Sequence, residues 1–218
     1  HASTCAFELS VGRNRVIVNC GSGLSFGEDW HLAGRSTASH AALGIDGQSS
    51  SRFGPAKKGK GRMLKDAPTI VMAQKTRAVD GVRLQVNHNG YQNSHGLVHA
   101  RTLDLPVDSK GLVGEDVLYA PDTQDVQRFK AIQAKSPETF RYTARFHLHP
   151  DVEASLESDG ASVSLTLING DVWVFRHRGF SQLYLEESVY FENFRLYPRP
   201  TAQIVLTSEI KEITTRVR

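Results

Sequence analysis

The chain of 218 residues has little of several residue types that mark particular protein classes. It contains two cysteines, two tryptophans and 8% aromatic residues. Two cysteines are too few for a disulfide-stapled scaffold, and neither stands in a CxxC pattern of the kind that binds metals or performs redox chemistry. Cys5 and Cys20 are expected to be buried thiols. A disulfide between them stays open as an alternative, because it would require their strands to be neighbours.

Long apolar runs and a strong net charge are also absent. No stretch approaches the roughly 20 apolar residues that a helix needs to cross a bilayer, so no membrane span is expected. The net charge of +3 suits an acidic partner but is far below that of a dedicated nucleic-acid binder, so no nucleic-acid partner is expected. Because the chain begins at His1 without a methionine or a signal-peptide pattern, it is expected to have lost preceding residues.

What the chain has in abundance is the alternating pattern of half-buried strands. Residues 139–149 place apolar side chains on one face and polar ones on the other. The polar face, with Arg141, Arg145, His147 and His149, is expected to meet solvent or another domain. Residues 161–168 and 172–178 flank Asn169-Gly170, which is a hairpin signal. Further strands are expected at 68–76, 81–88, 96–105, 182–191, 201–210 and 212–218.

Glycine-containing turns separate these strands, among them Asp80-Gly81, Asn89-Gly90 and Asp159-Gly160. Only residues 122–135 could form a helix, and a polar loop is the alternative there. Many short strands without alternating helices predict an all-β fold. We expect a large antiparallel β-sandwich with little helix, formed by residues 1–218 as a single domain.

One basic segment interrupts the pattern. Residues 49–66, "SSSRFGPAKKGKGRMLKD", are rich in glycine, serine and lysine. The segment is expected to be a mobile loop, because it offers few apolar side chains to anchor it. It is either a solvated insertion or a loop that steers an anionic polymer.

The succession of motifs resembles a known family. "HASTCAFELSVGRNRVIVNCGS" is followed by "RSTASHAALGIDGQSSSRFG", "HNGY", "LVHAR", "RFHLHP" and "EESVYF". This order resembles the C-terminal β-domain of the heparinase II/III-like polysaccharide lyases and covers essentially the whole chain. The resemblance implies a supersandwich-like β-domain that follows an N-terminal α/α-toroid, a domain that this chain lacks. It implies a periplasmic or secreted location and leaves a cytoplasmic one open.

The resemblance also implies a zinc site. The family's ligands are the histidine of an "HxDxxxF" motif, the aspartate of a "DxG" motif and the histidine of "sTxxHNTLxxDG". They correspond here to His1, Asn19 and His40. Asn19 departs from the pattern, because an amide oxygen is a neutral and weaker donor than a carboxylate. The alternative is a metal-free site in which His1 is disordered and His40 is a hydrogen-bonded core residue.

The chemistry that the resemblance implies is β-elimination on an acidic polysaccharide. Such a lyase neutralises the C5 carboxylate of a uronic acid, removes the C5 proton and protonates the leaving oxygen. In the family most of these groups come from the toroid, so no catalytic residue is assigned in this chain. The chain would form one wall of the cleft, with His88, Tyr91, His99 and Arg101 as candidate substrate contacts. The alternative is a non-catalytic carbohydrate-binding or structural domain.

Overall fold

The computed structural model describes residues 1–57, 61–108, 110–135 and 140–218. Strands make up 51% of it and helices 14%, in several antiparallel sheets, which confirms the all-β class. The chain forms two compact units. Unit 1 comprises residues 1–66 and 142–208, and unit 2 comprises residues 67–141 and 209–218. Among the described residues no helix is both long and apolar enough to cross a membrane.

Unit 1 contains a sheet in the order β1-β2-β10-β15-β14, with β3 paired to β10. These strands are β1 (Leu9–Val11), β2 (Asn14–Val18), β3 (Leu43–Ile45), β10 (Phe140–Leu148), β14 (Gln182–Tyr190) and β15 (Arg199–Ile210). A second sheet has the order β11 (Glu153–Leu156), β12 (Ser162–Thr166) and β13 (Val172–Arg176). The helices of this unit are short: η1 (Leu24–Phe26), α1 (Glu28–Ala33) and η2 (Thr37–Ser39).

The alternation predicted for residues 139–149 is confirmed in β10, with one exception. Tyr142, Ala144 and Leu148 are buried on the apolar face, while Arg141 is exposed. His147 lies on the polar face but is only 3% exposed. His147 therefore does not meet solvent, because its ring is enclosed by hydrogen-bonding groups from other elements. Contact of this face with another domain stays a prediction. Residue 139 lies outside the described residues.

The segment expected to be a mobile loop instead contains a hairpin. β4 (Arg52–Lys57) pairs antiparallel with β5 (Gly61–Asp66), and residues 58–60 between them lie outside the described residues. The guanidinium of Arg35 stacks over the Phe53 ring at 4.6 Å and donates a hydrogen bond of 2.6 Å to the Arg62 carbonyl. Phe53 therefore supplies the apolar anchor that the composition of the segment concealed.

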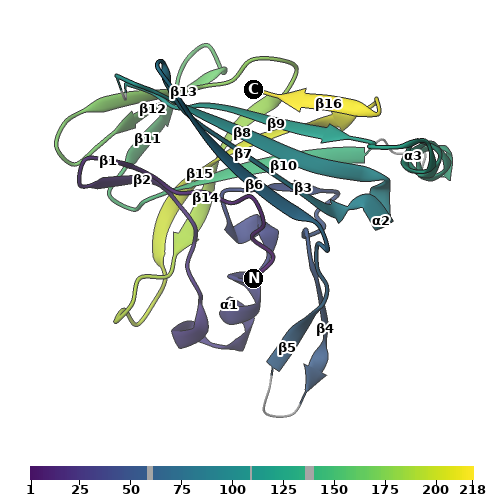
Figure 1. Ribbon diagram of the computed structural model, residues 1–218. Helices are drawn as coiled ribbons and strands as arrows, with labels where there is room; N and C mark the ends of the chain where they lie inside the picture. Colours follow the sequence, from purple (N-terminus) through teal and green to yellow (C-terminus); the bar gives the residue numbers. More distant parts are fainter. Residues whose placement is uncertain (58–60, 109, 136–139) are drawn as a thin grey trace. The chain divides into compact units, whose positions relative to one another are not determined.

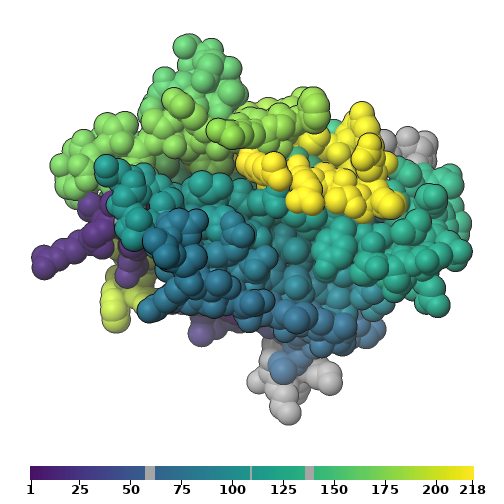
Figure 2. Space-filling model, turned by 45° about the horizontal axis from the view of Figure 1, so that its top comes forward, coloured from purple at the N-terminus to yellow at the C-terminus, as the bar shows by residue number. Residues whose placement is uncertain are grey.

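Unit 2 is a five-stranded sheet in the order β16-β9-β8-β7-β6 (Figure 1). Its strands are β6 (Val71–Ala78), β7 (Gly81–Tyr91), β8 (Leu97–Pro106), β9 (Val113–Tyr119) and β16 (Thr214–Val217). β6 forms one edge of the sheet, and all its residues are exposed. Its blue residues form part of the surface in Figure 2. β9 was not expected from the sequence.

The turn predicted at Asn89-Gly90 does not form. β7 continues through both residues to Tyr91, with a register irregularity between His88 and Tyr91. The side chain of Asn89 accepts hydrogen bonds from the backbone N–H groups of Thr69 and Ile70, at 3.0 and 3.1 Å, so it ties down the start of β6. The connection to β8 is made instead by the short helix α2 (Gln92–His95).

Residues 122–135, for which helix and loop were both open, form helix α3 (Thr123–Lys135). The Asp122 carboxylate accepts a hydrogen bond of 2.9 Å from the Asp125 N–H, which caps the first turn. Phe129 is 1% exposed and packs its ring against Phe140, with the ring centroids 5.7 Å apart. One capping group and one buried aromatic residue thus help to fix a helix whose sequence is mostly polar.

Candidate functional site

Three of the four predicted substrate contacts belong to one buried polar network in unit 2. In the register of the sheet, His88 lies opposite His99, and Arg101 lies opposite Asp116. Because alternate residues of a strand share a face, His99 and Arg101 point to the same side of β8. The side chains of all four are nearly inaccessible, with residue exposures between 0 and 6%.

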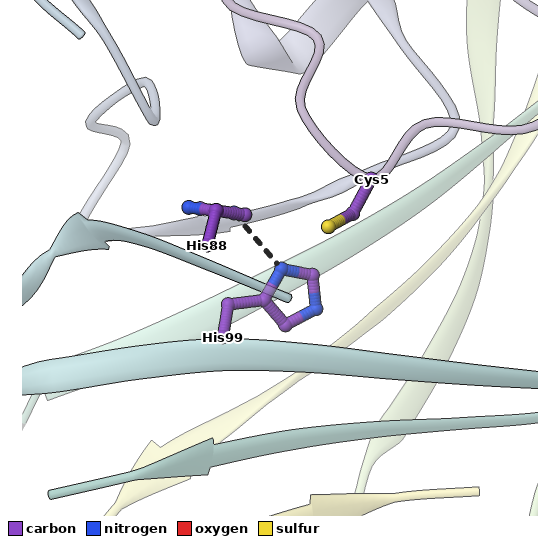
Figure 3. A group of neighbouring side chains, drawn as sticks. All are labelled: Cys5, His88 and His99. Carbon is purple, nitrogen blue, oxygen red and sulfur yellow. Dashed lines mark hydrogen bonds between the residues drawn. The ribbon is translucent and has the colours of Figure 1, made fainter. Parts of the chain in front are cut away.

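The hydrogen bonds of this network run in one direction, and Figure 3 shows the one that joins His88 and His99. The Gly90 N–H donates to Nδ1 of His88 at 3.0 Å, so His88 carries its proton on Nε2 and donates to Nδ1 of His99 at 3.2 Å. His99 then donates from Nε2 to Oδ1 of Asp116 at 2.8 Å. Both ring nitrogens of each histidine are therefore satisfied within unit 2.

Asp116 closes the network through a bidentate ion pair. Arg101 donates from Nε and from a terminal nitrogen to the two carboxylate oxygens, at 2.7 and 2.8 Å. Burial raises the pKa of Asp116, but the charge of Arg101 and the hydrogen bond from His99 outweigh burial and hold this pKa well below its usual range. Burial, together with the charges of His99 and Arg101, lowers the pKa of His88 to about 3, so its ring is neutral at pH 7.

Tyr91, the fourth predicted contact, is 0% exposed beside this network. Its ring lies between those of His88 and His95, with centroid distances of 5.5 and 6.2 Å. The four residues lie together in unit 2 as packed and hydrogen-bonded side chains. Contact of these residues with a sugar stays a prediction.

The three predicted metal ligands also lie together, in unit 1. The rings of His1 and His40 are 5.5 Å apart between centroids, and Nδ1 of His40 is 3.2 Å from Oδ1 of Asn19. The N-terminal segment is held there because Ala2 donates its N–H to the Arg35 carbonyl, and its own carbonyl accepts a bond of 2.6 Å from the Thr37 hydroxyl.

The donor set of this cluster does not fit zinc. Oδ1 of Asn19 already accepts the Ala41 N–H at 3.0 Å, and its Nδ2 donates to Glu8 at 3.0 Å, which fixes the orientation of the amide. Two imidazoles and a neutral, occupied amide oxygen lack the third anionic or imidazole donor of protein zinc sites. We therefore derive no chemistry from a metal here.

His40 nevertheless keeps one buried ring nitrogen available. Its Nε2 makes no hydrogen bond within the described residues, and the residue is 5% exposed. An interaction with the Gly34 backbone raises the pKa of His40. Burial, followed by the charge of His147, outweighs this effect and lowers the pKa of His40 to about 4. The ring is neutral at pH 7.

A third cluster of unit 1 was not predicted from the sequence. His147 donates from Nε2 to the Ala38 carbonyl at 2.8 Å, so its Nδ1 is an acceptor for the Ser188 hydroxyl at 2.7 Å. The Cys20 thiol lies 3.4 Å from the same Nδ1. All four residues line an open groove of about 750 Å³. In this arrangement the neutral imidazole of His147 accepts a hydrogen bond from the Ser188 hydroxyl, as a general base does from a serine nucleophile.

Burial sets the protonation of this cluster. It raises the pKa of Cys20 to about 11, so the residue is a thiol at pH 7, and it lowers the pKa of His147 to about 4. Cys5 and Cys20 form no disulfide, as expected, although Cys5 is only half-buried. The polar-face position of His147 was visible in the sequence, but its partners lie 41 and 109 residues away.

Comparison with known proteins shows which family the chain belongs to. The sequence family described as "Heparinase II/III-like, C-terminal" matches residues 1–218. The "FtsZ-localized protein C" of Caulobacter vibrioides (strain NA1000 / CB15N) is 30% identical over 220 residues, which cover 100% of this chain and 36% of that protein.

Two solved structures show the same fold. The heparan sulfate lyase HepC from Pedobacter heparinus superposes with a TM-score of 0.69 at 14% identity, over 97% of this chain and 29% of that one. Heparinase III gives a TM-score of 0.67 at 14% identity, over 97% of this chain and 28% of its own. The chain thus spans little more than a third, or less, of the proteins that it matches. It belongs to the heparinase II/III-like family, whose C-terminal domain it matches from end to end.

Proposed function

We propose that this chain is the β-domain of a polysaccharide lyase that cleaves acidic polysaccharide by β-elimination, and that it forms one wall of the substrate cleft. The observation that carries this proposal is the family match over residues 1–218. The fold shared with a heparan sulfate lyase supports it. Because the chain covers only 29% of that enzyme, we assign the remaining groups of the cleft to a further part of the protein.

The buried network of unit 2 supports a positioning role for this domain. A lyase needs a free cation beside the uronate and a free base beside the C5 proton. The charge of Arg101 is balanced by Asp116, and the ring nitrogens of His88 and His99 are all hydrogen-bonded. These residues therefore stiffen the sheet behind the proposed wall, and the base comes from elsewhere.

A non-catalytic interaction domain is the second candidate. The relative with 30% identity over the whole chain is named for its localisation with FtsZ, not for lyase activity. The fully hydrogen-bonded network around Asp116, and the lack of a third good zinc ligand beside His1 and His40, favour the same interpretation. In that case the β-domain would bind a protein or a glycan without cleaving it.

The two candidates differ in the products that the full-length protein forms. We expect the full-length protein to release unsaturated uronate, measured as new ultraviolet absorbance, from heparin-like, alginate-like or other acidic glycans. The 218-residue chain alone should form none, because the acid and the base must both lie within hydrogen-bond reach of one sugar ring. Full-length protein that binds such glycans, or FtsZ, without elimination would establish the second candidate. Elimination by the chain alone would refute the assignment of the base to another part.

A further inference from the structure

A small pocket of unit 1 lies where three turns of the chain meet. The β1–β2 hairpin contributes Arg13 from its turn and Arg15 from β2, the segment after β10 contributes His149 and Asp151, and the β12–β13 turn contributes Ile168. The pocket has a volume of about 220 Å³, which is enough for one monosaccharide ring or a single anionic group. The His149 N–H donates to the Val16 carbonyl at 3.0 Å, so the backbone fixes the first two segments to each other.

The charge of this pocket is positive and uncompensated. Asp151 is the acidic residue of the lining, and Arg199 neutralises it through a contact of 2.8 Å. Arg15 donates to the Tyr190 hydroxyl at 2.9 Å, which is a neutral partner. Arg13 makes no ion pair with any residue that the structure describes. Both guanidinium groups of the β1–β2 hairpin thus keep their charge for a ligand.

The histidine of the pocket does not supply this charge. Burial lowers the pKa of His149, against the opposing effect of Asp151, so the ring is mostly neutral at pH 7. It packs against the Tyr190 ring, with the centroids 5.1 Å apart. His149 therefore acts as a hydrogen-bonding wall and as a support for Tyr190, which in turn holds Arg15.

The remaining lining is apolar. Val152 and Leu167 are buried at 8% and 3% exposure, and Ile168 is 76% exposed at the rim. A site with guanidinium donors on one side and an aliphatic surface on the other suits an anion that is attached to a ring with C–H faces. A free inorganic anion would leave the apolar side without a partner.

We propose that the Arg13–Arg15–His149 pocket binds one carboxylate- or sulfate-bearing sugar unit of an acidic polysaccharide. The choice of polymer rests on the proposed function; the anionic group and the ring follow from the pocket itself. Arg13 and Arg15 would pair with the anionic group, and the aliphatic residues would contact the ring. The pocket would thus hold the polymer at a site separate from the networks of His88 and His147.

Binding of defined saccharides to the chain tests this proposal. We expect binding of oligogalacturonate and of a sulfated disaccharide, and little binding of uncharged maltotetraose. R13Q and R15Q should each weaken binding about tenfold, which corresponds to the loss of one charge-assisted hydrogen bond. R178Q is the matched control, because Arg178 is an exposed arginine of the same unit that does not line the pocket. NMR shifts confined to residues 13–15 and 168 would locate the ligand.

Several outcomes would overturn the inference. They are equal binding by R13Q, R15Q and wild type, inorganic sulfate binding as tightly as the saccharides, and duplex DNA binding more tightly than either. The failure of the proposed function is distinguishable. If the full-length protein cleaves acidic glycans with an unchanged KM in R13Q and R15Q, the pocket assignment fails alone. If the chain binds saccharides through these arginines but the full-length protein cleaves none, the lyase assignment fails alone.

Discussion

Arg83 and Arg101 form the same bidentate pair with an aspartate directly opposite on the next strand of one sheet, but in different surroundings. The Arg83–Asp104 side chains are 56% and 36% exposed, whereas those of Arg101 and Asp116 are 2% and 7% exposed. Water can replace either partner of the first pair, but not of the second. At the scale of single residues, burial therefore decides whether a charge is available to a ligand or is committed to the fold.

This contrast predicts the effect of two matched substitutions. D116N should lower the free energy of unfolding by about 3–5 kcal/mol, because it leaves the Arg101 charge buried and uncompensated. D104N, the control, should lower the free energy of unfolding far less than D116N, because the partner of Asp104 is solvated. Urea unfolding measures both. Equal losses for the two variants would show that the buried network does not stabilise the sheet.

A second prediction at this scale concerns Asn19. The wild-type protein should bind Zn²⁺ weakly, and N19D combined with E8Q should bind it at least about tenfold more tightly, because a carboxylate then joins two imidazoles. The E8Q change preserves a hydrogen bond to residue 19, and E8Q alone is the control without gain. Calorimetric titration with Zn²⁺ measures the difference. Tight zinc binding by the wild type would contradict our conclusion on the donor set.

At the scale of elements, connections were harder to predict than strands. Asn89-Gly90 has the composition of a hairpin turn, yet its backbone continues β7 while the Asn89 side chain binds Thr69 and Ile70. The chain turns instead through α2 and Gly96, whose φ of +69° lies in the left-handed region. A turn dipeptide forms a turn only when no distant backbone competes for its side chain.

The crowding at Gly96 predicts a large effect of one methyl group. A Cβ added there would overlap the Asp125 carbonyl oxygen in α3, whereas Gly47, with the same φ of +69°, has nothing within 4 Å. G47A should cost about 1 kcal/mol of unfolding free energy from backbone strain alone. G96A should cost about 3 kcal/mol or more, because α3 must move. Thermal unfolding with both variants tests this, and equal costs would mean that α3 is not held against α2.

At the scale of the whole molecule, the chain is one family domain that folds as two compact units, each with its own buried polar network. Unit 2 buries His88 against His99, and unit 1 buries His40 and His147. Burial lowers the pKa of His88 from an ordinary 6.5 to about 3, and those of His40 and His147 to about 4. Protonation therefore opposes folding in both units.

The sign of the pH dependence follows from these directions. As the pH falls below 6.5, these histidines become protonated in the unfolded chain but stay neutral in the folded chain. The free energy of unfolding is therefore highest above pH 6.5 and declines toward pH 4. Each histidine contributes up to about 1.4 kcal/mol per pH unit in this window. Urea midpoints measured from pH 7 to pH 4.5 should fall steeply, and H147Q should reduce the slope by about a third. A flat profile would mean that these rings titrate normally.

The sequence by itself determined the fold class, the family and most of the strands. Alternation of apolar side chains is a local signal, and it appears in full within residues 139–149 and 161–178. The family resemblance grouped His1 with His40, and His88 and His99 were candidate contacts of the same cleft wall. Only the tertiary structure decided what these side chains do.

The physical reason is that a side chain is free to contact a ligand only if no other residue binds it, and the residues that bind it are distant in sequence. The ring of His147 is hydrogen-bonded to Ala38 and Ser188. The charge of Arg101 is neutralised by Asp116, which lies on an unpredicted strand, and the ring of Phe53 contacts the guanidinium of Arg35. None of these pairings leaves a trace in local periodicity. The sequence predicted no site at Arg13 and Arg15 of the β1–β2 hairpin for the same reason, because a charge becomes a candidate site only when its surroundings leave it uncompensated.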